Sequence, residues 1–106
     1  MHLAVRPLLA ALLLAGVVPL VAAQDAAVLR QRALAATCAN CHGTQGRAVD
    51  GAAVPGLAGM PAPYMVEQMK AFKAGTRPAT VMHQLSKGFS DAQIESVAVY
   101  FAAQKK

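Results

Sequence analysis

The stretch Thr37-Cys38-Ala39-Asn40-Cys41-His42 decides the fold, because it contains the pattern C-x-x-C-H. In this pattern each thiol can add across one vinyl group of a haem to form a thioether, and the adjacent imidazole then faces the iron from the same side. The motif therefore predicts one covalently attached haem c. Cys38 and Cys41 are its expected attachment points, and His42 is the expected axial ligand of its iron.

Three other uses of the cysteine pair fit the chain less well. A structural zinc site usually has four ligands, whereas this chain has two cysteines and no second Cys/His pair at short spacing. A thioredoxin-like motif lies between a strand and a helix, and no strand pattern is present. A disulfide between Cys38 and Cys41 would close a very short loop and contribute little stability.

Length and charge limit the remaining possibilities. The chain has 106 residues, ten of them basic and five acidic, which gives a net charge of +5. This length allows one domain, and so small a domain usually needs a disulfide, a metal or a cofactor to stabilise its modest core. The positive charge permits docking on acidic proteins. No nucleic-acid-binding motif is present, so we expect no nucleic-acid partner.

Residues 1–23 have the three parts of a secretory signal peptide. Arg6 supplies a basic start, residues 8–20 are almost entirely apolar, and Val21-Ala22-Ala23 ends in small residues. We therefore expect export to the periplasm and cleavage after Ala23, leaving a mature domain of residues 24–106 with a net charge of +4 once Arg6 is lost. The alternative is an uncleaved anchor, but the apolar run is shorter than the roughly 20 residues that span a bilayer. After cleavage we expect no stable membrane insertion.

The first half of the mature chain has two helical patterns around a loop. Asp25 can cap a helix that runs to about residue 37. A loop rich in glycine follows from residue 39 to about residue 60, since glycine and proline at this density interrupt helices. A second helix should follow Pro61 and Pro63 and end at Gly75.

The second half predicts a short helical turn at residues 79–86 and one more helix. Ser90 and Gln93 have the spacing of a capping box, which opens a helix. The apolar face of that helix consists of Ile94, Val97, Ala98 and Phe101. No alternating pattern is long enough for a strand, so the sequence predicts an all-α domain.

The sixth ligand of the iron decides the function, because a vacant position binds small molecules whereas a filled one favours electron transfer. Met65 and Met69 share the apolar face of a helix and are expected to fill the core. Met60 follows His42 by only 18 residues, which is early for a chain that must go around the haem. Met82 follows His42 by 40 residues and is the predicted ligand, with the adjacent His83 as its best rival.

The mature chain resembles the class I c-type cytochromes over nearly all of residues 25–104. Within this class it most resembles the one-haem halves of cytochrome c4 and the cytochrome subunit of flavocytochrome c sulfide dehydrogenase. The blocks that carry the resemblance are residues 36–43, 54–59, 72–75, 81–82, 87–91 and 97–101. The resemblance implies the small class I cytochrome c fold, wrapped around one covalently attached haem.

The resemblance also implies roles for particular residues. The family's thioethers fall on Cys38 and Cys41, its proximal ligand on His42 and its distal ligand on Met82. The family's proline falls on Pro55, whose carbonyl accepts a hydrogen bond from the proximal imidazole and thereby orients the ring.

Two departures from these relatives stand out. They often carry two haem motifs, whereas this chain has one. Many also have an aromatic residue where the first helix crosses the last, whereas this chain has Leu34 there. We expect Val97 and Tyr100 to pack at this crossing against Ala33 and Leu34.

These observations predict an electron-transfer protein rather than an enzyme. Two axial protein ligands leave no open position on the iron, so electrons would pass through the haem edge. The chain would act as a soluble carrier or as the cytochrome subunit of a flavoprotein dehydrogenase such as one for sulfide, with a terminal oxidase as another possible redox partner. The alternatives are a haem-based sensor, if the sixth position is labile, and a thiol–disulfide protein.

Overall fold

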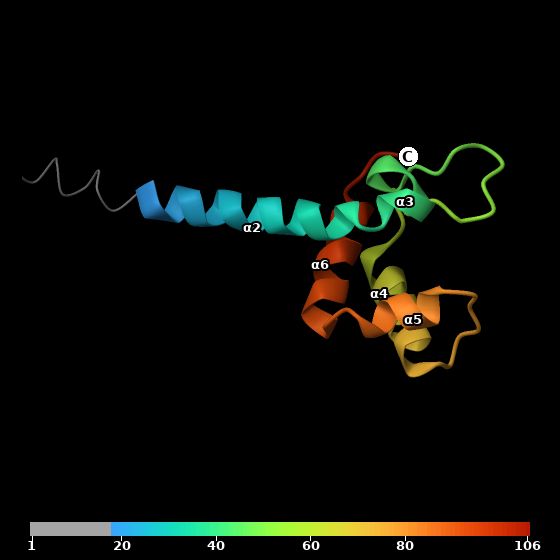
Figure 1. Ribbon diagram of the computed structural model, residues 1–106. Helices are drawn as coiled ribbons and strands as arrows, with labels where there is room; N and C mark the ends of the chain where they lie inside the picture. The colour runs from blue at the N-terminus through green and yellow to red at the C-terminus, as the bar shows by residue number, and fades with distance from the viewer. Residues whose placement is uncertain (1–17) are drawn as a thin grey trace, which may run out of the picture. The chain divides into compact units, whose positions relative to one another are not determined.

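The computed structural model describes residues 18–106, and within this range it contains helices and no strand. The elements, shown in Figure 1, are α2 (Val18–Ala36), α3 (Ala39–His42), the 3-10 helix η1 (Thr44–Gly46), α4 (Ala62–Ala74), α5 (Met82–Lys87) and α6 (Asp91–Ala102). The all-α prediction is therefore confirmed. Most of the predicted signal peptide, residues 1–17, lies outside the described residues. In the described range no helix combines the length and apolarity that a membrane span requires.

The chain divides into two compact units, of which one ends at Arg30 and the other spans residues 31–106. In the first unit, the expected helix cap at Asp25 is wrong, because Asp25 lies inside α2. The residues just before it are Ala22, Ala23 and Gln24, which favour helix, and no glycine or proline among them ends it. The predicted haem motif and all its expected ligands belong to the second unit.

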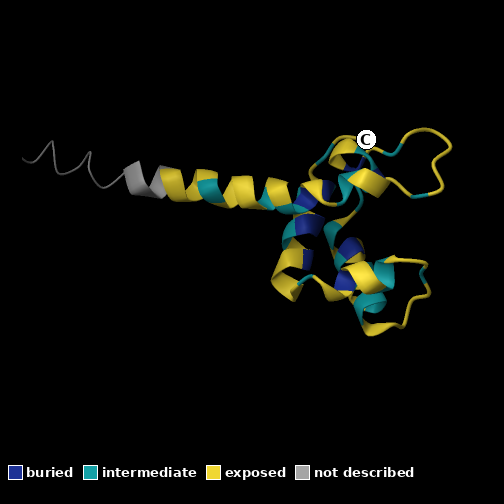
Figure 2. Cartoon of the chain, viewed as in Figure 1, coloured by how far each residue is buried: buried dark blue, intermediate teal, exposed yellow. Residues whose placement is uncertain are grey.

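The core of the second unit is small and lies where α2, α4 and α6 meet (Figure 2). Its buried members are Ala35, Met65, Val97, Ala98 and Phe101. The predicted apolar face of α6 is confirmed, since Ile94, Val97, Ala98 and Phe101 are all buried. The ring of Phe101 also meets that of Tyr100 edge-on, with 5.1 Å between the ring centroids.

The crossing of α2 and α6 uses a different face of α2 from the one expected. Leu34 and Tyr100 do pack against the core, but Ala33 is exposed and Ala35 is buried in its place. Gln31 lies four residues before Ala35, so both side chains share one helical face. The Gln31 side-chain amide donates to the Ser96 carbonyl at 3.0 Å, and this contact turns the face toward α6.

The ends of α4, α5 and α6 follow local sequence signals. The predicted capping box is present, because the Ser90 hydroxyl accepts from the Gln93 amide and the Gln93 side chain accepts from the Ser90 amide. Gly75 ends α4 in the left-handed conformation, as expected, but α4 begins at Ala62, before Pro63, because proline is tolerated in the first turn of a helix. Helix α5 begins later than predicted, at Met82. The residues just before it are Thr80 and Val81, whose β-branched side chains lower helix propensity.

The loop after η1 is fastened to α6. The Gly46 carbonyl accepts from the amides of Leu57 at 2.8 Å and Ala58 at 3.1 Å, and the Gly59 amide donates to the Phe101 carbonyl at 2.9 Å. Gly46 has a φ of +76°, and a Cβ atom there would lie 2.8 Å from both the Ala58 nitrogen and a Phe101 ring carbon. Only glycine allows this close approach.

Candidate haem-binding site

The cysteine motif forms a turn of helix rather than the start of a loop. The prediction of a loop from residue 39 is wrong at this point, because α3 covers Ala39–His42. Its first carbonyl, that of Cys38, accepts from the amides of Cys41 at 3.3 Å and His42 at 3.0 Å. Residues three apart on a helical turn are neighbours on its surface. The turn therefore brings Cys38 and Cys41 to one side, next to His42.

The two thiols are free and have different surroundings. Cys38 is half-buried and packs against the core, whereas Cys41 is exposed. Burial raises the pKa of the Cys38 thiol, and its contact with the Thr37 hydroxyl opposes this shift. Cys38 is therefore the inner thiol and Cys41 the outer one.

His42 is held by the backbone of the glycine-rich loop. Its side chain is buried, and Nδ1 lies 2.7 Å from the Pro55 carbonyl oxygen, to which its N–H donates. Since this bond puts the proton on Nδ1, the lone pair of Nε2 is free to bind a metal. The loop thus fixes both the tautomer and the orientation of the imidazole.

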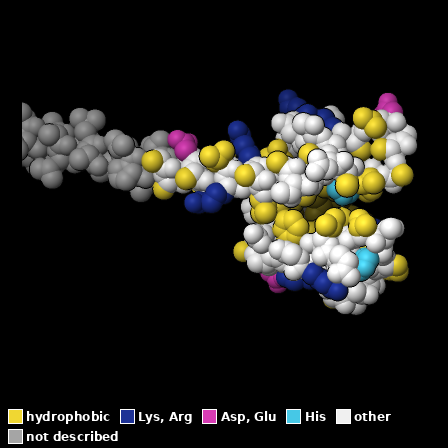
Figure 3. Space-filling view, viewed as in Figure 1, with side chains coloured by type: hydrophobic (Ala, Val, Ile, Leu, Met, Phe, Trp, Pro, Cys, Tyr) yellow, Lys and Arg dark blue, Asp and Glu magenta, His cyan; other side chains and the backbone are white. Residues whose placement is uncertain are grey.

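The surface of the described chain has a hollow that suits a flat apolar group. Figure 3 shows a hollow lined by hydrophobic side chains, with a histidine at its rim. A haem needs an apolar pocket, one fixed imidazole and two thiols at the spacing of its vinyl groups. The free thiols of Cys38 and Cys41, the oriented His42 and the hollow meet these needs. The residues present therefore fit a covalent haem.

The four described methionines have different environments. Met65 belongs to the buried core and Met60 packs against it, while the Met69 sulfur accepts from the Ser86 hydroxyl at 3.6 Å. Met82 lies outside this core cluster, half-buried at the first position of α5. His83 follows it, and the buried His83 Nδ1 has no hydrogen-bond partner among the described residues.

Sequence reasoning missed two residues that hold α5 in place. Ser86 is completely buried, although a serine in a short polar segment gives no sign of burial. The Lys73 ammonium donates to the Phe89 carbonyl at 2.7 Å, across 16 residues of chain. A helical-wheel comparison could have placed Ser86 on the face of Met82, four residues earlier. No sequence signal could have found the backbone partner of Lys73.

Comparison with known proteins identifies the family. The family model for cytochrome c matches residues 30–104. A thiosulfate dehydrogenase electron acceptor from Thiomonas intermedia is 38% identical over 67% of this chain and 33% of its own length. The cytochrome subunit of sulfide dehydrogenase from Chlorobaculum tepidum is 34% identical over 73% of this chain and 68% of its own length.

A solved structure agrees with these matches. The cytochrome c4 of Acidithiobacillus ferrooxidans superimposes with a TM-score of 0.58 and 36% identity, over 62% of this chain and 37% of that one. The resemblance to cytochrome c4 and to the sulfide dehydrogenase subunit is thus confirmed, as is the class I cytochrome c fold. The chain spans about a third of the length of the electron acceptor and of the cytochrome c4 chain.

The family match also settles the cofactor. A cytochrome c domain carries haem c covalently, and Cys38 and Cys41 supply the two cysteines of its C-x-x-C-H motif. The relatives support electron transfer, without catalysis, as the activity of such a domain. The chain therefore belongs to the cytochrome c family.

Proposed function

We propose that the whole protein transfers single electrons through one haem c ligated by His42 and Met82. The observation that carries this proposal is the hydrogen bond from His42 Nδ1 to the Pro55 carbonyl, 2.7 Å long. It fixes an imidazole, directly after two haem-linking cysteines, in the tautomer that binds iron. Bound haem supplies an iron that takes up and releases one electron.

The residues of this chain supply attachment, orientation and enclosure. Cys38 and Cys41 would hold the group through thioethers, and His42 would bind its iron on one side. Pro55 would act through His42, since a hydrogen-bonded imidazole is a stronger electron donor to a metal. A geometry fixed in this way changes little between oxidation states, which favours rapid electron transfer.

Met82 is proposed as the distal ligand because the other methionines have packing roles. Met65 and Met60 are in or against the core, and Met69 receives a hydrogen bond from Ser86. His83 is the rival. Because neighbouring residues of a helix point in different directions, Met82 and His83 would not both face the iron. A neutral methionine sulfur opposite a histidine is typical of electron-transfer haem and raises the reduction potential.

The near-infrared spectrum of the ferric protein tests this proposal. His–Met haem has a weak sulfur-to-iron charge-transfer band there, so wild type should show it. Met82→Ala should abolish the band, lower the reduction potential and let the ferrous protein bind carbon monoxide. Met60→Ala is the matched control and should retain the band. If the band is lost with Met60→Ala but survives Met82→Ala, the ligand assignment is wrong.

The same measurement separates the carrier from a haem-based sensor. A sensor requires a vacant or labile sixth position. If the wild-type protein lacks the band and binds carbon monoxide readily, the carrier proposal fails and the sensor takes its place.

The names of the relatives support a dehydrogenase as the electron donor. One is the electron acceptor of a thiosulfate dehydrogenase and another is the cytochrome subunit of a sulfide dehydrogenase. We therefore propose a redox protein partner, and specifically a dehydrogenase of reduced sulfur compounds, with this chain as a carrier or subunit. A terminal oxidase would then accept the electrons. Co-purification from the native host, followed by mass spectrometry, should recover a dehydrogenase subunit; recovery of the cytochrome alone would favour the free carrier.

Export is proposed from the signal peptide pattern of residues 1–23. The mature domain would be residues 24–106, located in the periplasm. Mass spectrometry of protein made in a host that matures c-type cytochromes should find Gln24 at the start and one haem per chain. An intact Met1 in the membrane fraction would overturn this proposal.

A further inference from the structure

Helix α5, which begins with Met82, is attached to α4 at two points beyond its own first turn. The first point is Ser86, which has no exposed surface and whose hydroxyl donates to the Met69 sulfur at 3.6 Å. Ser86 lies four residues after Met82, so both residues occupy one face of α5. Whatever fixes Ser86 against α4 therefore also fixes the rotation of α5 about its axis.

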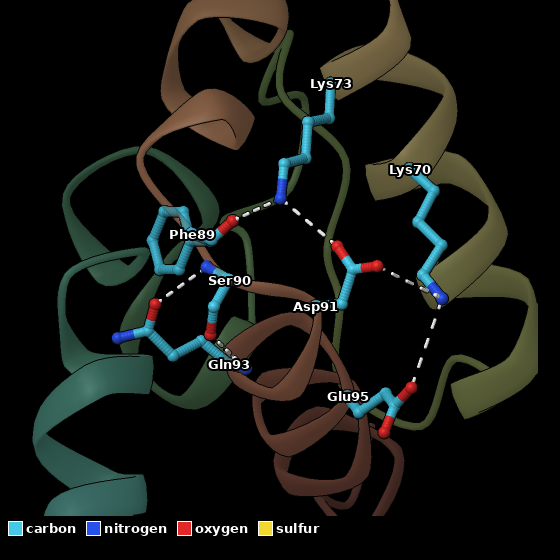
Figure 4. Close-up of polar contacts among 7 residues, drawn as sticks. All are labelled: Lys70, Lys73, Phe89, Ser90, Asp91, Gln93 and Glu95. Carbon is cyan, nitrogen blue, oxygen red and sulfur yellow. Dashed lines mark hydrogen bonds and ion pairs between the residues drawn. The ribbon is translucent and has the colours of Figure 1, made fainter.

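The second point lies just after α5 and involves Lys73, in the last turn of α4. Figure 4 shows its ammonium between the Phe89 carbonyl, 2.7 Å away, and the Asp91 carboxylate, 3.1 Å away. The bond to Phe89 is charge-assisted, which makes it stronger than a neutral hydrogen bond. Lys73 thus ties the segment between α5 and α6 to the same helix that Ser86 contacts.

The two contacts together restrict how α5 can move. Met69 and Lys73 are four residues apart and lie on one face of α4. Their partners, Ser86 and Phe89, lie at and just beyond the end of α5. Two hydrogen bonds along the same face of α4 oppose both sliding and rotation of α5.

We propose that Lys73 is a positioning residue for Met82. Together with Ser86, Lys73 holds α5 in the position in which the Met82 sulfur would bind the iron. This inference rests on the proposed ligation by Met82. The chain supplies the constraint from α4, because α5 has only six residues and so short a helix is not stable by itself.

Lys70 provides a matched control on the same helix. It has the same charge and approaches the same residue, Asp91, at 3.9 Å, and also Glu95 at 4.0 Å. Within the described part of the chain its ion pairs are made with α6, and none is made with the segment that follows α5 (Figure 4). Lys70→Met therefore removes a comparable surface charge and ion pair while leaving the Phe89 contact intact.

The test is the rate at which imidazole replaces the distal ligand in the ferric holoprotein, followed in the visible and near-infrared spectrum. Lys73→Met should raise this rate about ten-fold, the size expected for loss of a charged hydrogen bond. Lys70→Met should change it by less than about two-fold, because exposed ion pairs contribute little. Lys73→Arg, which keeps a donor at this position, should restore most of the wild-type rate.

Each result decides the proposal. Suppose that wild type shows the sulfur-to-iron band. Equal replacement rates for Lys73→Met and Lys70→Met would then overturn the positioning role and leave Met82 ligation intact. A wild type without the band would overturn both. If Lys73→Met gives no holoprotein, Ser86→Ala replaces it. The proposal is supported if imidazole replaces the distal ligand faster in Ser86→Ala than in wild type, while the unfolding free energy in guanidinium is no lower than that of Lys70→Met. An unchanged replacement rate overturns it.

Discussion

His42 Nδ1 donates a 2.7 Å hydrogen bond to the carbonyl oxygen of Pro55, thirteen residues further along the chain. Backbone atoms hold this carbonyl, because the loop that contains it is tied to Gly46 and, through Gly59, to Phe101. The orientation of the imidazole therefore depends on the packing of the last helix as well as on the motif itself.

Loosening the loop at Pro55 should alter the reduction potential. Pro55→Gly keeps the carbonyl but removes the ring that restricts the backbone, so the bond to His42 should weaken. A less strongly bonded imidazole donates less to iron, which favours the ferrous state and raises the potential. Potentiometric titration measures the change, and Pro61→Gly serves as the control in a neighbouring segment. A fall in stability without any change in potential would show that Pro55 has only a structural role.

Removing the cysteines should separate attachment from folding. Cys38→Ala and Cys41→Ala should each retain one thioether, and the double variant should retain none. Haem-stained denaturing gels would show the loss. Because a bound group stabilises the folded state that binds it, the double variant should lose helicity and cooperative unfolding. Thr37→Ala, next to the motif, should keep the full haem stain, and a double variant that unfolds like wild type would contradict the stabilising role of haem.

Acid should weaken the contacts at the start of α6. The hydrogen bond from Lys73, with attraction from Lys73 and Lys70, lowers the pKa of Asp91. The unfolded chain therefore binds this proton more readily than the folded one, so the carboxylate stabilises the fold above the ordinary Asp pKa of about 3.9. This stabilisation should disappear as the pH falls from about 4 through the lower pKa of the folded state.

Urea unfolding of wild type and Asp91→Asn at several pH values measures this effect. The difference in unfolding free energy should be present at pH 7 and should shrink as the solution becomes acidic. In a background that carries both Lys73→Met and Lys70→Met, the same substitution should show much less pH dependence. A difference that stays constant down to pH 2 would contradict the assignment to this ion pair.

The capping box should contribute to stability without affecting the spectrum. Ser90→Ala removes the hydroxyl that accepts from the Gln93 amide at 3.2 Å. Loss of such a cap costs about 1 kcal/mol of unfolding free energy, which guanidinium titration can detect. The near-infrared band should remain, since Ser90 does not hold α5. Loss of the band would mean that α6 itself controls the distal ligand.

Sequence patterns predicted the features that depend on neighbouring residues. The C-x-x-C-H motif, the Ser90 box, the glycine that ends α4 and the apolar face of α6 all act within one turn or one helix. The family resemblance added Pro55 and Met82 as expected site residues, and their roles at the iron stay predictions.

The features that sequence reasoning missed depend on distant contacts. Ala35 replaces Ala33 at the helix crossing because Gln31 reaches Ser96, 65 residues away. The attachment of α5 through Ser86 and Lys73 depends on the packing of α4. Every residue has a backbone carbonyl, so the sequence does not indicate that the carbonyl of Phe89 is the one that Lys73 contacts.

The contact between Gly46 and Phe101 places an unequal constraint on how the family can diverge at these positions. A smaller residue at 101 would leave a cavity but would not prevent the loop from closing. A larger residue at 46 would remain excluded even then, because the positive φ and the nearby Ala58 nitrogen both oppose it. Substitutions should therefore accumulate at position 101 before any appear at position 46. Of this pair, the aromatic ring of Phe101 is the residue that can be replaced.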